Sequence, residues 1–306
     1  MAARSLKSLL IWFVSLSLLV GGVSAQEFFP IDESAGRFQI GQPEPTSIFR
    51  QERGSASGQR TQTEEERELE TDRDSFTPAT TLVSPGRFIL ESAYSFIDNR
   101  ATFDTHSLPE LVLRYGLTER LEVRLQWNYE VGGAGNTVSA EGGDEDFDVP
   151  GIERESQVGY GLKLRCTQQR GWIPESAFLA LGFSPTSGPD NVTSFVGTYV
   201  FGWTLPGRWK LDGAFRYSCD SVAGDGHNLW APSVVLKIPM GERINLHAEY
   251  FGIFTTQKSD NSNGQYFSPG LHYLLSRDLE VGFRVGWGLN DDAARFFVNT
   301  GVGWRF

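Results

Sequence analysis

LEVRLQWNYEV, residues Leu121 to Val131, decides the fold. Its apolar and polar residues alternate without exception: one set is leucine, valine, tryptophan and tyrosine, the other glutamate, arginine, glutamine and asparagine. Side chains of a β-strand point to opposite faces with a period of two, so the stretch predicts a strand with one apolar and one polar face. About nine to eleven tilted residues cross a bilayer, whereas strands of soluble sheets average about five or six.

The same alternation recurs from Gly86 to Phe306 and predicts twelve strands, of which the fifth, from Ser176 to Phe183, is less regular. Short turns and longer polar connections, such as Gly132 to Glu155 and Asp220 to His227, follow one another in strict alternation, as in outer-membrane barrels. An open sheet would leave backbone groups unpaired in lipid, so the sheet must close. We therefore predict an all-β fold, a closed antiparallel transmembrane β-barrel of about 12 strands with a flexible N-terminal segment; the alternative is a secreted soluble sandwich.

Composition excludes two classes of protein. The 306 residues carry a formal charge of −11, and the isoelectric point is near 4.9, which disfavours nucleic acid as a partner. Mean hydropathy is −0.28, and no apolar run of about twenty residues follows the N-terminus, which excludes a helical membrane protein. A barrel remains compatible with these values because alternating strands average to near neutrality.

The N-terminal third divides into two parts. Residues 1–25 have a basic start, an apolar core and a Val23-Ser24-Ala25 cleavage site, which predicts a secretory signal peptide. Residues 26–85 are polar, and such a composition buries too little apolar surface to offset the entropy of ordering. We expect them to be a largely disordered periplasmic segment before a barrel at 86–306; the alternative is a plug, mainly residues 72–85, that folds back into a pore.

The C-terminus carries a specific pattern. Asn299, Gly301, Trp304 and Phe306 follow the polar-x-Gly-x-x-aromatic-x-aromatic arrangement that resembles the assembly signal of bacterial outer-membrane barrels. Together with the signal peptide and the strands, this pattern predicts the bacterial outer membrane as the location, with the N-terminal segment in the periplasm. The expected partners are outer-membrane lipid, the barrel assembly machinery and a small-molecule solute.

If the apolar faces meet lipid, the opposite faces line a lumen. The candidate lining residues of a transport path are Glu91, Glu110, Arg114, Glu122, Arg124, Lys163, Arg165, Arg216, His247, Glu249 and Arg284. Both signs of charge are present in similar numbers, which predicts no strong preference for anions or cations. The alternative is an internal salt-bridge network that fills the lumen. Inward glycines, among them Gly161, Gly270 and Gly303, leave space either for an open path or for a packed N-terminal segment.

Catalytic and metal-binding signals are weak. The acidic connection between Gly132 and Glu155 lacks the spacing of an EF-hand, and the four histidines lack metal-binding spacing, so no metal or cofactor is predicted. His247 next to Glu249 on one face is interpreted as polar lining rather than as a proton-sensitive pair. Cys166 and Cys219 are predicted to lie near opposite ends of their strands, as two free thiols.

Four stretches of the chain resemble a known family. These are Thr71–Thr77, Leu108–Glu122, Leu275–Leu279 and Gly288–Ala293, and together they resemble the outer-membrane transporter family labelled "MetA-pathway of phenol degradation". The resemblance covers Thr71 to Phe306 and implies a barrel and a transport role; aromatic solutes are implied only by the label. Asp74 stands where the family pattern has proline.

We therefore expect a channel or transporter for the passive passage of small solutes, and not an enzyme. A barrel hydrolase at the cell surface is one alternative, which a cluster of serine or aspartate with histidine at the external rim would favour. A plugged barrel with a structural or adhesive role is the other, which a lumen blocked from both sides would favour.

Overall fold

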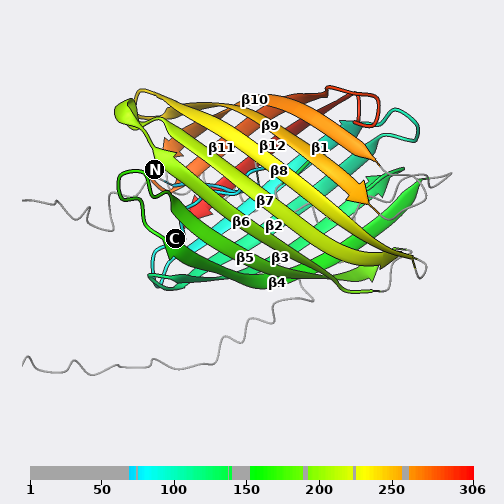
Figure 1. Ribbon diagram of the computed structural model, residues 1–306, viewed down its shortest axis with the longest axis horizontal. Helices are drawn as coiled ribbons and strands as arrows, with labels where there is room; N and C mark the ends of the chain where they lie inside the picture. The colour runs from blue at the N-terminus through cyan, green and yellow to red at the C-terminus, as the bar shows by residue number, and fades with distance from the viewer. Residues whose placement is uncertain are drawn as a thin grey trace, which may run out of the picture. The chain divides into compact units, whose positions relative to one another are not determined.

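A computed structural model describes residues 69–73, 75–136, 138–139, 152–188, 192–222, 225–256 and 262–306. Within them, twelve antiparallel strands close into a barrel in which each strand pairs with its neighbours in sequence and β1 pairs with β12 (Figure 1). The predicted fold class and strand number are confirmed. The signal-peptide prediction lies outside the described residues.

The strands are 10 to 16 residues long, enough for a tilted strand to cross a bilayer. Their bounds are β1 Phe88–Asp98, β2 Thr105–Thr118, β3 Leu121–Gly132, β4 Glu153–Thr167, β5 Glu175–Ser187, β6 Ser194–Thr204, β7 Lys210–Val222, β8 Asp225–Met240, β9 Ile244–Thr256, β10 Asn263–Ser276, β11 Leu279–Gly288 and β12 Phe296–Arg305. No helix in the described part of the chain has the length and apolar character needed to span a membrane.

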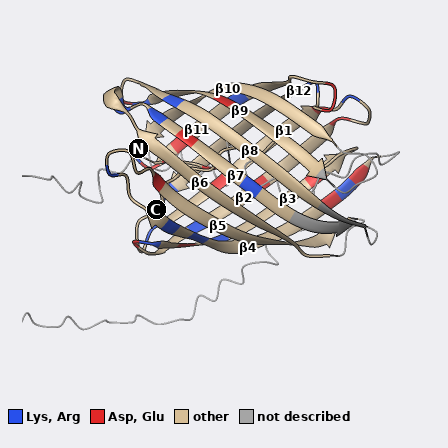
Figure 2. Cartoon of the chain, viewed as in Figure 1, with Lys and Arg blue, Asp and Glu red and all other residues tan. Residues whose placement is uncertain are grey.

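Strand β3 shows how the sequence sets the two faces. Leu125 and Trp127 point outward, with exposed fractions of 52% and 38%, whereas Glu122 and Arg124 point into the barrel with 0% and 1%. The same division holds around the barrel: large apolar residues are exposed on the outer face of every strand. The strands therefore present an apolar outer surface of the kind that faces lipid. Figure 2 shows residues of both charges along the strands and near their ends, and the buried ones have side chains that point into the barrel.

The two ends of the barrel differ. At one end, which we call the short-turn end, two residues suffice between β2 and β3, Glu119–Arg120, and between β10 and β11, Arg277–Asp278. The opposite, long-loop end carries the connection from β3 to β4, residues 133–152. The predicted long connection at Asp220 to His227 is wrong, because β7 and β8 pair as far as Val222 and Asp225. Strand ends that extend beyond the apolar belt need not alternate, so the sequence pattern stops before the strand does.

The N-terminal segment departs most from expectation. Residues 69–73 and 75–85, which we call the lumen plug, contact inward-facing side chains of β3, β4, β8, β9 and β11, so they lie inside the barrel. Asp72, Phe76 and Ala79 are at most 2% exposed. The prediction of a flexible segment is wrong for this stretch, and the plug alternative describes it. The composition argument failed because partners on the barrel wall satisfy the polar groups of the segment.

Candidate functional site

The lumen plug runs into the barrel from the short-turn end and returns to it. At the entrance, Glu70 forms an ion pair with Lys210 at the start of β7. Farther in, the Thr77 hydroxyl donates to the Ser233 hydroxyl of β8 at 2.8 Å. On the way back, the Val83 amide donates to Glu122 at 2.9 Å, and Pro85 forms a β-bridge with Gly116 before β1 begins. The plug is therefore a loop within the lumen, covalently continuous with the wall.

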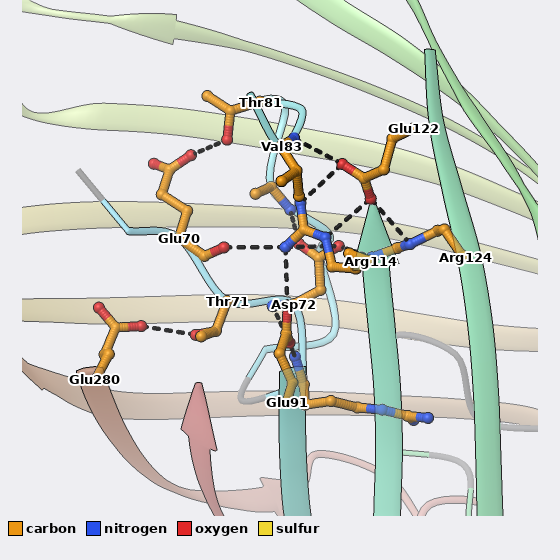
Figure 3. A network of polar contacts seen from close by, with 12 residues as sticks. Glu70, Thr71, Asp72, Thr81, Val83, Glu91, Arg114, Glu122, Arg124 and Glu280 are labelled. Atoms are coloured by element: carbon orange, nitrogen blue, oxygen red, sulfur yellow. Dashed lines mark hydrogen bonds and ion pairs between the residues drawn. The ribbon is translucent and has the colours of Figure 1, made fainter. Parts of the chain in front are cut away.

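Asp72 is the centre of the contacts near the short-turn end (Figure 3). Its carboxylate pairs with Arg124 and lies 3.6 Å from Arg114 and 3.9 Å from Lys163. It also accepts a hydrogen bond from the amide of Ala79 at 2.8 Å, which ties the two limbs of the plug together. All three cations come from adjacent strands, β2, β3 and β4, because alternation places these residues on the inner face.

Two wall carboxylates complete this network (Figure 3). Glu91 accepts the amides of Asp72 and Arg73 at 2.7 and 3.0 Å. Arg114 donates at 2.9 Å to both Glu91 and Glu122, and at 3.0 Å to the carbonyl oxygen of Glu70. Each charged group thus has opposite charges or backbone partners around it, as burial in a low-dielectric site requires. The predicted salt-bridge network is present, but the plug contributes its central carboxylate.

The plug carboxyls have perturbed acidities. Burial alone would raise the pKa of Asp72, but Arg114, Lys163 and Arg124 outweigh it and hold that pKa well below its usual range. Burial opposes ionisation of Glu70 in the same way, and Lys210 and Lys237 lower its pKa below the ordinary value. Both groups are therefore charged in the docked plug at neutral pH, and their attraction to the wall persists on acidification.

The inner end of the plug is held differently. Glu249 accepts the amides of Phe76 and Thr77 at 3.0 and 2.7 Å and also pairs with Arg284 at 3.1 Å. The Phe76 ring stacks on Phe251, with centroids 4.1 Å apart and planes at 6°. The guanidinium of Arg216 also lies over the Phe76 ring, 4.3 Å from its centroid, which is a cation–π geometry. Aromatic packing and one carboxylate hold this part.

A second segment enters from the long-loop end. Residues 133–136 and 138–139, which we call the inner loop, follow β3, and the Asn136 amide donates to Glu130 at 2.7 Å. The Asn136 side chain donates to Glu110 at 2.8 Å, while Arg284 and Arg216 donate to the carbonyl oxygens of the next described residues, Val138 and Ser139. The described residues therefore occupy the lumen from both ends, which is the arrangement that the plugged-barrel alternative expects.

Three wall residues connect the two segments, directly or through one neighbour. Glu110 lies 3.8 Å from Arg73 of the plug and also accepts from the inner loop. Arg284 binds Glu249, which holds the plug, and it also donates directly to the inner loop. Arg216 contacts Phe76 of the plug on one side and Ser139 of the inner loop on the other. Displacement of either segment must therefore break contacts of residues that hold the other.

The structure places every predicted lining residue inside the wall, each at most 8% exposed. Most of them bind the plug or the inner loop: Glu91, Glu110, Arg114, Glu122, Arg124, Lys163, Arg216, Glu249 and Arg284. Arg165 lies 3.9 Å from Glu175 within the wall. The His247 ring lies edge-on to His272, with centroids 4.9 Å apart, whereas the expected neighbour Glu249 binds plug amides and Arg284.

Sequence reasoning missed the plug residues that complete the site, Glu70, Asp72 and Phe76. One usable signal was the set of inward glycines. A Cβ atom at Gly303 would lie 2.1 Å from the Thr71 methyl, and one at Gly116 would lie 2.2 Å from the carbonyl oxygen of Ser84. These glycines leave room for the plug. For Gly303, the sequence analysis had named a packed N-terminal segment as one of two possible occupants of that space.

A small pocket remains at the short-turn mouth. It has a volume of about 40 Å³, and its lining includes Lys210, Lys237, His247, His272 and Glu280. The plug residues Leu69, Glu70 and Thr71 also line this pocket, so it lies between the plug and the wall.

Two further observations concern metal ligands and cysteines. In the described residues, no group of three or more His, Cys, Asp or Glu side chains is placed to hold a metal ion. Cys166 is a free, exposed thiol, as predicted. The side chain of Cys219 lies outside the described residues.

An apolar outer surface, a closed sheet and a charged interior define a transmembrane β-barrel of the outer-membrane type. The chain belongs to the family described as "Putative MetA-pathway of phenol degradation", whose sequence pattern matches residues 71–306. The match begins inside the lumen plug, so the plug belongs to the region shared by the family. None of the curated protein sequences matches this chain.

Solved structures with the same fold include an outer membrane channel from Pseudomonas putida F1, with 13% identity, a TM-score of 0.52, and coverage of 74% of this chain and 98% of the channel. A porin named NanC aligns with 9% identity and a TM-score of 0.48, over 71% of this chain and 98% of the porin. At such low sequence identity, structural similarity is evidence for a shared fold and not for a shared function. The conclusion of a shared fold rests on the alignment with the channel from Pseudomonas putida F1.

Proposed function

We propose that this protein is a passive outer-membrane channel for small solutes, without enzymatic activity, and that its path is closed by the lumen plug. The observation that carries the proposal is how the plug is held near the short-turn end. Ion pairs and charge-assisted hydrogen bonds join it to a charged wall through Asp72, Glu91 and Arg114. A charged wall can be rehydrated when the plug leaves, so the lumen can become a water-filled path.

The fold and family support the rest of the assignment. Lipid contacts the outer face, the signal peptide directs export, and Asn299, Gly301, Trp304 and Phe306 are recognised by the barrel assembly machinery. An even strand number places both barrel termini at the short-turn end, which faces the periplasm. The wall contributes both signs of charge, so the open path has little ion selectivity. The family label makes aromatic compounds the first solutes to assay.

The test is single-channel conductance in planar bilayers. The mature chain from residue 26 is compared with a form that starts at residue 84, so that the plug is deleted except for Ser84 and Pro85, which lead into β1. We expect the truncated form to show discrete open steps and the mature chain to show rare or smaller ones. Equal steps in both forms would remove the plug from the proposal, and silence from both folded forms would reject the channel.

A further inference from the structure

Three cations of the barrel wall converge on one carboxylate that does not belong to the wall. Arg114, Arg124 and Lys163 come from the neighbouring strands β2, β3 and β4, and we call them the cation cradle. All three face the same carboxylate oxygen, Oδ2 of Asp72. Arg124 pairs with it directly, and nitrogens of Arg114 and Lys163 lie 3.6 and 3.9 Å away. These four side chains are at most 1% exposed, so the cradle is a buried site with a carboxylate seated in it.

Lys163 depends on the plug for its direct polar partners. Its amino group donates to the carbonyl oxygen of Ala79 at 2.7 Å and lies 3.9 Å from Asp72, and both partners belong to the plug. A buried ammonium group is costly unless it is paired and hydrogen-bonded. When the plug undocks, Lys163 therefore loses both partners, and water or a mobile anion must replace them.

The wall carboxylates at this level bind the two arginines of the cradle (Figure 3). Glu122 lies 2.9 Å from Arg114 and 3.2 Å from Arg124, and Glu91 lies 2.9 Å from Arg114. Both carboxylates are carried by strands, β3 and β1, so they stay in place when the plug leaves. The plug takes Asp72 with it. An open lumen therefore keeps the whole cradle and loses the carboxylate that the cradle now holds.

We propose that the cation cradle is a binding site for a small organic carboxylate, and that Asp72 occupies it as an internal mimic of this ligand while the channel is closed. The ligand carboxylate binds between Arg124 and Lys163. This assignment rests on the proposed function, because a solute reaches the cradle only when the plug has undocked. It adds a ligand class and a competition, since a bound carboxylate and the docked plug exclude each other. The wall as a whole carries both signs of charge, so the site holds an anion at one level of the path.

Acetate is the matching probe, because it has the carboxylate and the neighbouring carbon of an aspartate side chain. Acetamide has the same shape without the charge. Binding of each ¹³C-labelled probe to the folded mature protein in detergent is measured by NMR titration at constant ionic strength. We expect Asp72→Asn to bind acetate at least about tenfold more tightly than the parent does, because the cradle has lost its internal carboxylate. Equal acetate affinity in the two proteins would overturn the mimicry, and equal affinity of the variant for acetamide would overturn recognition of the charge.

Two further substitutions in the Asp72→Asn protein locate the site. Lys163→Met removes the ammonium group, keeps an unbranched side chain and should weaken acetate binding at least about tenfold. Arg295→Gln, the matched control, removes a half-exposed arginine paired with Asp98 at the barrel end and should leave acetate binding unchanged. Acetate binding that survives Lys163→Met would overturn the assignment to the cradle.

The parent protein provides a measurement that needs no substitution. The Ala79 amide donates to Asp72 in the docked plug, so its hydrogen exchange reports whether Asp72 is in place. Acetate that competes with Asp72 should speed this exchange severalfold relative to chloride at the same ionic strength. The same exchange rate in both salts would overturn the competition.

Conductance of the same preparations distinguishes this inference from the proposed function. Open steps in Asp72→Asn, together with acetate binding no tighter than in the parent, would keep the channel and reject the carboxylate site. Acetate binding that depends on Lys163, in a barrel that never conducts, would keep the site and reject the channel.

Discussion

The short-turn half and the long-loop half of the lumen hold the same segment by different physical means. In the first, Asp72 sits among Arg114, Arg124 and Lys163, and these ion pairs are accompanied by apolar contacts of the plug residues Leu69, Leu82 and Val83. In the second, Phe76 stacks on Phe251 and lies against Arg216, so rings and one carboxylate supply the contacts. Electrostatic contacts fail together when one charge is removed, whereas packed contacts weaken in proportion to the area lost.

Asp72→Asn should give the largest effect, because it leaves three buried cations without their shared carboxylate. Removing one partner of a buried ion pair costs about 3–5 kcal/mol, enough to release the plug. We expect channel openings close to those of the truncated form in planar bilayers. Asp278→Asn, which removes an exposed partner of Arg305, is the matched control and should behave as the parent. A closed Asp72→Asn channel would show that the short-turn half does not hold the plug.

Glu249→Gln should give a smaller, local effect. The amide cannot accept from the Phe76 and Thr77 amides on both atoms, and Arg284 loses its carboxylate. Bonds to a charged acceptor contribute about 1.5–3 kcal/mol, so the amides of Phe76 and Thr77 should exchange hydrogen about ten- to a hundredfold faster. Glu242→Gln, in the exposed turn between β8 and β9, is the control. Unchanged exchange rates would contradict the proposed role of Glu249.

Phe76→Leu should weaken only the long-loop half. The change keeps an apolar side chain but removes the stack on Phe251 and the contact with Arg216, which together contribute about 1–2 kcal/mol. Hydrogen exchange should rise at residues 75–77 and stay unchanged at Asp72 and Arg73. Phe103→Leu, at a side chain 56% exposed, is the control. Faster exchange at Asp72 would show that the two halves release the plug as one unit.

Mild acid should have the smallest effect. The pKa values of Asp72 and Glu70 are lowered in the folded protein, so the attraction they provide is complete above the ordinary carboxyl pKa of about 4. It is lost only as the pH falls through their lowered pKa values. The conductance difference between Asp72→Asn and the parent should therefore be the same at pH 7 and pH 5. A difference that disappears at pH 5 would mean that Asp72 is not ion-paired as described.

The sequence predicted the barrel because two environments act on every strand. Lipid outside and a polar interior impose a period of two, and β3 shows it without a break. The end of β7 was mispredicted because the alternation is required only where the outer face of the strand contacts lipid. Strand ends beyond the belt are read only from pairing, such as that of Val222 with Asp225.

The plug was only the alternative in the sequence analysis because its partners are remote. Thr71 donates to Glu280, 209 residues away in the chain, and Asp72 meets cations of three strands. A polar segment looks unable to fold when its own composition is the only measure, since the charges that satisfy it belong to the wall. The wall residues could be identified because the alternation predicts that their side chains point into the barrel. Their role as anchors for a second segment could not be predicted, because the orientation of a side chain does not specify its partner.

The join between the plug and β1 has a kinetic consequence. Pro85 bridges to Gly116, and Gly86 donates to the carbonyl oxygen of Gly116 at 2.8 Å, so the tether that follows the plug is only a few residues long. A short tether keeps a released segment at an effective concentration on the order of millimolar at its own site. Rebinding is then intramolecular and independent of protein concentration. Openings should be brief, and a synthetic peptide of the plug sequence should compete only at millimolar concentrations.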